Sequence, residues 1–186
     1  MRRGYSWPLT PNTKPCCRLK PAGTGSTRRS RRWPPTASTP RWFTGWGACA
    51  RVATLTAFGL AVEIGDWDRL TGSSIGAYLG LVPTESSSGQ SRSQGSITKT
   101  GNTHARRLLV EAAWHHRKPY RSPGVAMKAR WELAPAAARA RGHAGSQRLH
   151  QRWLTFTDRK KKPVIANVAI ARELAGWCWS LAVMDG

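Results

Sequence analysis

A run of three serines, at positions 86 to 88, stands directly before Gly89 in the middle of the chain. A serine hydroxyl becomes a nucleophile when a base or a metal ion takes its proton, or when the phosphate that it attacks is strongly polarised. A neighbouring glycine lets the backbone approach a phosphate closely. The serines therefore could attack a phosphodiester, although a serine cluster in a loop is more often a flexible linker.

Basic side chains follow the serines. Lys99, together with the N–H groups at the start of a helix near Gly101, could bind phosphate oxygens. Arg106 and Arg107 come one turn later and are expected to face away from the apolar side of that helix. Basic residues on a helix usually form a solvated face. In combination with the serines they predict a site that holds a nucleic-acid backbone beside a hydroxyl.

The elements that carry these residues are expected to be helices. The apolar run 55–64 ends at a glycine and predicts a buried helix closed by that glycine. Ser73 or Ser74 could cap a short helix that ends before Pro83. Residues 84–101 are rich in Ser, Gly and Gln, which predicts a long loop.

Further helices are expected after the loop. Asn102 is placed to cap a helix with an apolar stripe at helical spacing, made of Ala105, Leu108, Leu109, Ala112 and His116. A weaker helical region at 125–140 is interrupted by Pro135, residues 147–156 predict another helix, and Pro163 opens a last one. The fold class is therefore mainly α: a small helical domain with a helix-hairpin-helix-like start and a long Ser/Gly loop.

The charge of the chain points to a polyanionic partner. Its 186 residues carry a formal net charge of +21, from thirty Lys and Arg against nine acids. Phosphate neutralisation releases counterions, so nucleic acid, above all DNA, is the expected partner. An anionic membrane is the alternative, but the sequence has no charge-free apolar run of membrane-spanning length and no secretion signal at its start. We expect a cytoplasmic, nucleoid-associated protein without membrane contact.

The first fifty residues differ from the rest. They contain no acid, yet they hold ten of the Lys and Arg and seven of the twelve prolines. Since they lack apolar periodicity, residues 1–50 predict a disordered basic segment that precedes a folded domain at 51–186. A nucleic-acid-binding arm is one interpretation. A frame-shifted remnant of a GC-rich gene is another, because shifted codons for residues 23–30 can spell the start of an amphipathic helix.

The sequence offers little for metal binding. Its four cysteines form no C-x-x-C framework, so zinc is not expected. His115 and His116 lack partners at ligand spacing and are assigned to core or surface. His104 lies near the proposed site and is a minor candidate for moving a proton. No metal ion is therefore assigned to this chain.

Five segments occur in a specific order: LTAFGLAVEIGD at 55–66, AYLGLVP at 77–83, SSG at 87–89, ITKTGN at 97–102 and RRLLVEAAW at 106–114. In this order and spacing they resemble the C-terminal domain of the insertion sequence 110 family of transposases, over residues 52–110. The resemblance implies a DNA recombinase that moves its own element, guided in some members by a structured RNA.

In that family a serine of the short S-G motif attaches covalently to a DNA strand end. Carried onto this chain, the nucleophile is Ser88, with Ser87 as the fallback. The residues expected to contact the nucleic-acid backbone are Lys99, Asn102, Arg106 and Arg107.

The resemblance also implies Mg²⁺, bound in the full-length family by carboxylates of an N-terminal RuvC-like domain. This chain has no acid before Glu63, so no cofactor is expected within it. We therefore expect a truncated copy, inactive alone, whose status as an enzyme is open. An element-encoded RNA and further copies of the chain are additional expected partners.

Three functions of different classes remain open on the sequence. The first is a transposase module or a relic of one. The second is a non-catalytic basic protein that binds DNA or RNA. The third is a translation product without a stable fold.

Overall fold

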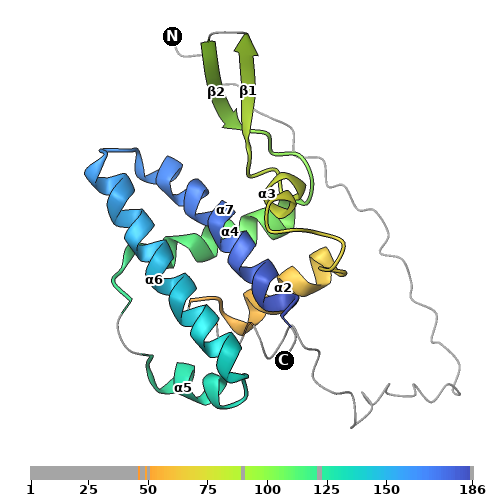
Figure 1. The fold of residues 1–186 in the computed structure, drawn as a ribbon, viewed down its shortest axis with the longest axis vertical. Helices are drawn as coiled ribbons and strands as arrows, with labels where there is room; N and C mark the ends of the chain where they lie inside the picture. The colour runs from red at the N-terminus through yellow and green to blue at the C-terminus, as the bar shows by residue number, and fades with distance from the viewer. Residues whose placement is uncertain (1–45, 47–48, 50, 89–90, 121–122, 185–186) are drawn as a thin grey trace, which may run out of the picture. The chain divides into compact units, whose positions relative to one another are not determined.

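The computed structural model describes residues 46, 49, 51–88, 91–120 and 123–184. Of residues 1–50, predicted as a disordered basic arm or a frame-shifted remnant, the structure describes Trp46 and Cys49 alone; both are buried in the core, and the rest of that prediction lies outside the described part. The described elements are mostly helices, which confirms the predicted class (Figure 1). In chain order they are α2 (Thr54–Ile64), α3 (Ser74–Tyr78), β1 (Pro83–Ser88), β2 (Ser91–Ile97), α4 (Thr103–Ala113), the 3-10 helix η1 (Trp114–Arg117), α5 (Val125–Glu132), α6 (Ala136–Asp158) and α7 (Pro163–Ala182).

The C-terminal helix α7 is the centre of the core. It packs against α6, α4 and α3 (Figure 1). Its residues Ile170, Leu174 and Leu181 are buried, while Trp177 is partly buried against the same cluster. Pro163 occupies the first turn, as predicted, where a missing N–H costs nothing. No helix in the described part is long and apolar enough to cross a bilayer.

Helix α6 approaches α7 closely at a glycine. A Cβ on Gly145 would lie 2.9 Å from the Trp177 ring, so a glycine here lets the indole approach this turn closely. The predicted helix at 147–156 is part of this longer element, which begins directly after Pro135, as the predicted interruption requires. Trp153 of α6 is buried. It is a core residue rather than a base-stacking one.

Helix α2 is confirmed, but its apolar run is buried on one side only, at Ala57, Leu60, Ala61 and Ile64. Gly65 closes the helix as predicted, with a φ of +69° and its N–H donated to the Ala61 carbonyl. Leu55, Phe58 and Val62 are exposed by 83%, 55% and 66%. The opposite side of α2 packs on α4. The run is therefore apolar on both faces of the helix, but the described contacts cover one face only.

The predicted loop at 84–101 is also wrong over most of its length. Strands β1 and β2 form an antiparallel hairpin, with Glu85 opposite Gln94 and Ser88 opposite Ser91. The strands are polar on both faces, so no alternation of apolar residues marks them in the sequence. Backbone pairing holds them instead, with an added bond from the Thr84 hydroxyl to the Ser96 carbonyl.

The short helix α3 lies as predicted but has a different cap. Neither Ser73 nor Ser74 caps it through its own side chain. The Thr71 hydroxyl oxygen instead accepts from the Ser74 N–H at 3.1 Å, while the Ser74 hydroxyl oxygen accepts from the Thr71 N–H at 2.8 Å. This reciprocal pair satisfies the first turn and fixes the connector after α2.

Candidate nucleic-acid site

The proposed nucleophile stands at the far end of the hairpin. Ser88 is the last residue of β1, is exposed, and pairs with Ser91 next to the turn. The hairpin projects from the helices (Figure 1). Strand β2 runs from Ser91 to Ile97 at the root of the hairpin, a length of about 20 Å at roughly 3.3 Å per residue. A hydroxyl in this position can reach into a bound ligand without steric hindrance from the helical body.

Lys99 lies at the opposite end of the hairpin from Ser88. It is the second residue after β2 and is exposed, and its N–H donates to the Gly80 carbonyl at 3.1 Å. Its φ of +57° is unusual for a residue with a Cβ and marks a strained, tightly specified turn. The expectation that Ser88 and Lys99 lie together is therefore not met, because strand pairing extends the segment between them.

Two glycines hold the backbone of this region together. Gly80, at the end of α3, and Gly101, before α4, have φ values of +64° and +76°. A Cβ on Gly80 would overlap the carbonyl oxygen of Thr100, and a Cβ on Gly101 would overlap that of Tyr78. The two segments thus meet backbone against backbone. This contact explains why both AYLGLVP and ITKTGN contain a glycine at that place.

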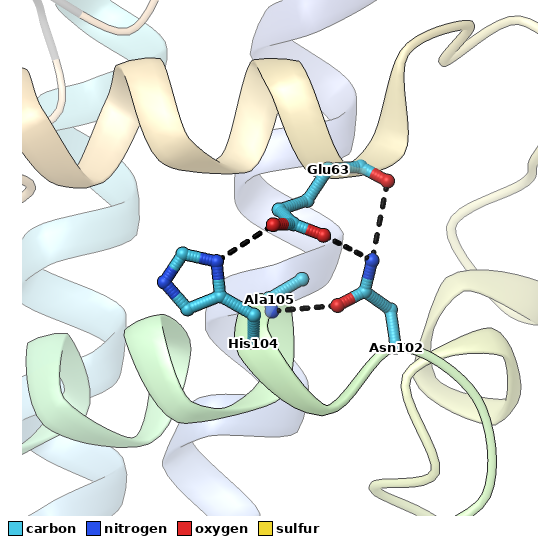
Figure 2. A network of polar contacts seen from close by, with 4 residues as sticks. All are labelled: Glu63, Asn102, His104 and Ala105. Atoms are coloured by element: carbon cyan, nitrogen blue, oxygen red, sulfur yellow. Dashed lines mark hydrogen bonds and ion pairs between the residues drawn. The ribbon is translucent and has the colours of Figure 1, made fainter. Parts of the chain in front are cut away.

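Asn102 links α4 to α2, as Figure 2 shows. Its side-chain oxygen accepts from the Ala105 N–H at 2.9 Å, which confirms the predicted cap. Its amide nitrogen donates to the Glu63 carboxylate at 2.7 Å and to the Glu63 carbonyl at 3.2 Å. His104 Nδ1 lies 2.7 Å from the other Glu63 carboxylate oxygen. Asn102 is therefore engaged in joining two helices.

Glu63 is a residue of this region that sequence reasoning did not single out. The hydrogen bond from Asn102 first, and that from His104 second, hold the pKa of its carboxyl below the ordinary value. Its ring partner His104 keeps an exposed side chain, 58% accessible. A separation of 39 residues between Glu63 and Asn102 leaves no spacing signal, so only the fold could reveal the pair.

The two arginines of α4 have different surroundings. Arg106 is half-buried and donates to the Leu79 and Thr100 carbonyls at 2.9 and 3.0 Å, so it braces the glycine contact. Arg107 is exposed and pairs with Glu111 at 2.8 Å, one turn along, and this partner raises its pKa. An exposed pair of this kind contributes little to stability. Nucleic-acid contact by these residues stays a prediction.

The described residues do not fit the Mg²⁺ that the family implies. No group of three or more His, Cys, Asp or Glu side chains lies together anywhere in the described ranges. The register partners of Ser86 and Ser88 are Ser93 and Ser91, whose neutral hydroxyls supply no carboxylate to hold a divalent cation. No chemical step is therefore assigned to a metal held by this part of the chain.

Comparison with known proteins agrees with the resemblance. Residues 49–126 match the model of the Transposase IS116/IS110/IS902 family. A curated protein of Sinorhizobium fredii (strain NBRC 101917 / NGR234), named "Putative transposase y4qE", is 36% identical over 149 residues, which is 77% of this chain. The chain spans 38% of the length of that relative. No solved structure matches the chain.

Proposed function

Residues 49–126 carry the domain of the IS116/IS110/IS902 transposase family, and from this premise we propose that the chain acts in DNA transposition as the serine-bearing, DNA-contacting half of a recombinase. The observation that carries the proposal is the hairpin, which presents Ser88 on an exposed end beyond a basic helical body. This arrangement suits a nucleophile that must enter a bound DNA strand.

In the proposed reaction the Ser88 hydroxyl oxygen attacks the phosphorus of a DNA phosphodiester. A bond forms between that oxygen and phosphorus, and the bond from phosphorus to the departing sugar oxygen breaks. The departing oxygen takes a proton, and the serine proton passes to a base. The phosphoserine linkage is itself a phosphodiester, so the strand end can later be transferred to a second strand by the reverse steps.

The groups that activate the serine are proposed to come from elsewhere. All nine acids of the chain follow residue 62, and those in the described ranges form no cluster. We therefore propose that the carboxylates and their Mg²⁺ are supplied by a separate region or a second polypeptide, and that the chain alone does not cleave ordinary DNA. A structured RNA, further copies of the chain and association with the nucleoid belong to the same proposal.

The experiment uses a DNA strand in which p-nitrophenol replaces the departing sugar at one phosphodiester. When this activated ester is attacked, the p-nitrophenolate group leaves with the electron pair of the broken bond. It needs no help from a metal ion. We expect a DNA–protein adduct that survives SDS, and release of one p-nitrophenolate per adduct. The adduct forms with the unchanged chain and with Ser86→Ala, and it is lost in Ser88→Ala. Loss in Ser87→Ala instead would assign the fallback residue.

A second candidate function is supported by the charge of +21. A non-catalytic DNA- or RNA-binding protein would bind with a steep dependence on salt, because each neutralised phosphate releases counterions. It would form no adduct with the activated strand. Binding without any adduct therefore favours this candidate and contradicts the serine chemistry.

A further inference from the structure

A groove runs beside α7. It has a volume of about 1200 Å³ and is bounded by α7, α3, α6 and the root of β2. Sites for small ligands usually hold roughly 300–1,000 Å³. The groove is therefore larger than a typical small-ligand site. We call this space the α7 groove.

The floor of the α7 groove is apolar. Val164 and Ile165 at the start of α7 are exposed by 65% and 56%, and Val168 continues the surface along the next turn. Ile97 of β2 and Trp177 of α7 also line the groove. A duplex presents mainly phosphates on its outside, which gain nothing from such a floor. Unpaired bases do gain, because their faces stack on apolar and aromatic side chains.

The rim of the α7 groove is cationic. Lys99, Lys161 and Arg172 line it and have no carboxylate partner in the part of the chain that the structure describes. Arg141 also lines it, with its guanidinium 4.7 Å from the centre of the Trp177 ring. Three unneutralised charges around an apolar floor are complementary to a strand that alternates phosphates with exposed bases.

One acid lies in the groove and is already neutralised. Glu173 contacts Arg152 at 3.1 Å and Arg148 at 3.2 Å. It therefore does not oppose an anionic ligand, and it holds Arg152 at the rim. The net charge of the groove remains strongly positive.

One end of the groove leads to the hairpin. Gln94, Gly95 and Ser96 of β2 line that end. Gln94 pairs with Glu85, and Ser88 lies three residues further along β1, about 10 Å at the strand spacing. A strand that leaves the groove along β2 therefore approaches Ser88.

We propose that the α7 groove binds a segment of single-stranded DNA and leads its end to the hairpin. The choice of DNA rests on the proposed function, because the strand that Ser88 attacks is DNA. The groove itself is assigned on its floor, its rim and its position, which are independent of the serine chemistry.

The test measures binding of a fluorescein-labelled oligothymidylate, dT20, by anisotropy over a range of salt concentrations. The double variant Lys161→Ala/Arg172→Ala removes two cations from the groove. Lys118→Ala/Lys128→Ala is the matched control. Both lysines are exposed and lie outside the groove, and this variant changes the net charge of the chain by the same amount as the groove variant. All four side chains are exposed, and thermal unfolding confirms that each variant folds.

We expect the groove variant to bind dT20 at least about tenfold more weakly at 0.1 M salt, with a salt slope lower by about 1.4, at about 0.7 per phosphate contact. The control variant should change the affinity less than about twofold, because it removes no phosphate contact. Unlabelled dT20 competes well, and a duplex of equal phosphate content competes poorly. Ile165→Ser, which keeps the charge, also weakens binding.

Several results would overturn the proposal. Equal losses in the two double variants would mean diffuse electrostatic attraction. A duplex or polyglutamate that competes as well as dT20 would remove the role of the apolar floor. Groove-dependent binding of the RNA strand rU20 more than tenfold tighter than dT20 would assign the groove to RNA. Ser88→Ala should bind dT20 as the unchanged chain does, because Ser88 lies outside the groove. Groove binding by the unchanged chain without an adduct would refute the serine chemistry alone. An adduct without groove binding would refute the groove alone.

Discussion

The amide nitrogen of Asn102 donates to both the carboxylate and the backbone carbonyl of Glu63, while its oxygen caps α4. One side chain thus satisfies the start of one helix and binds the last turn of another. The loop from β2 to α4 is fixed by this contact on one side and, on the other, by the close backbone approaches of Gly80 to Thr100 and of Gly101 to Tyr78. The position of the hairpin root, and of Lys99 with it, depends on both.

Substitution of Asn102 tests its double role. We expect Asn102→Ala to lower the free energy of unfolding by about 1 kcal/mol or more, since a lost N-cap alone costs that much. Asn102→Asp keeps the capping oxygen but places a second carboxylate against Glu63. It should therefore also be less stable than the unchanged chain at pH 7, by urea unfolding, and the deficit should shrink as acid protonates the pair. An Asp variant as stable as the parent at pH 7 would show that the contact with Glu63 contributes nothing.

The pKa of Glu63 predicts a dependence of stability on pH. Because its folded pKa lies below the ordinary value of 4.5, the folded state favours the charged carboxylate. This stabilisation is fully present above pH 4.5 and is lost as the pH falls through the lower folded value. Glu63→Gln should be less stable than the parent at pH 7, and the difference should narrow below pH 4. Urea unfolding at pH 7 and at pH 3.5 measures this, and a constant difference would contradict it.

His116 is a buried histidine that lowers the stability of the folded chain. Neither ring nitrogen has a hydrogen-bond partner among the described residues, and burial first, then the charge of Arg51, lowers its pKa from 6.5 to about 3. The unfolded chain binds a proton at this residue below pH 6.5 and the folded chain does not, so stability falls as the pH drops from 6.5 towards 3. Leucine has a similar volume and no polar atoms.

We therefore expect His116→Leu to raise the free energy of unfolding at pH 7 by about 1–3 kcal/mol, the cost of an unpaired buried polar group. It should also flatten the loss of stability between pH 6.5 and 4. His115→Leu is the matched control, since the side chain of His115 is exposed and its charge is a smaller cause of the lowered His116 pKa than burial, so its removal should change both quantities much less. Equal acid sensitivity in the two variants would assign the effect to another group.

The glycine contact is tested by a pair of alanine substitutions. Gly80 and Gly65 both have a positive φ, +64° and +69°, which residues with a Cβ rarely adopt, so both substitutions carry a backbone penalty. A Cβ on Gly65 meets nothing within 4 Å, whereas a Cβ on Gly80 overlaps the backbone of Thr100. Gly80→Ala should therefore cost at least about 2 kcal/mol more than Gly65→Ala, in the range of severe core substitutions. Equal losses of thermal stability would mean that the backbones do not meet there.

The elements that the sequence predicts well are those with helical periodicity. The Asn102 cap, the glycine after α2, the break at Pro135 and the start at Pro163 are all local signals, and the structure confirms them. The hairpin was missed because its strands are held by backbone pairing and have no apolar face.

The arrangement of the candidate site needed the fold. Glu63 and Asn102 are far apart in the sequence, and Lys161 and Arg172 of the α7 groove belong to segments without a motif. The choice of Ser88 among three neighbouring serines came from the family resemblance, since composition and spacing do not distinguish them.

The most direct measurement is the site of the DNA adduct. Trypsin cuts after Arg69 and Arg92, so the three serines of β1 fall in one peptide, 70–92. After reaction with the activated strand and nuclease digestion, fragmentation of this peptide by mass spectrometry should place the phosphonucleotide on Ser88. Its attachment to a residue outside the serine run, or its absence from a chain that binds the strand fully, would contradict the proposed role of the hairpin.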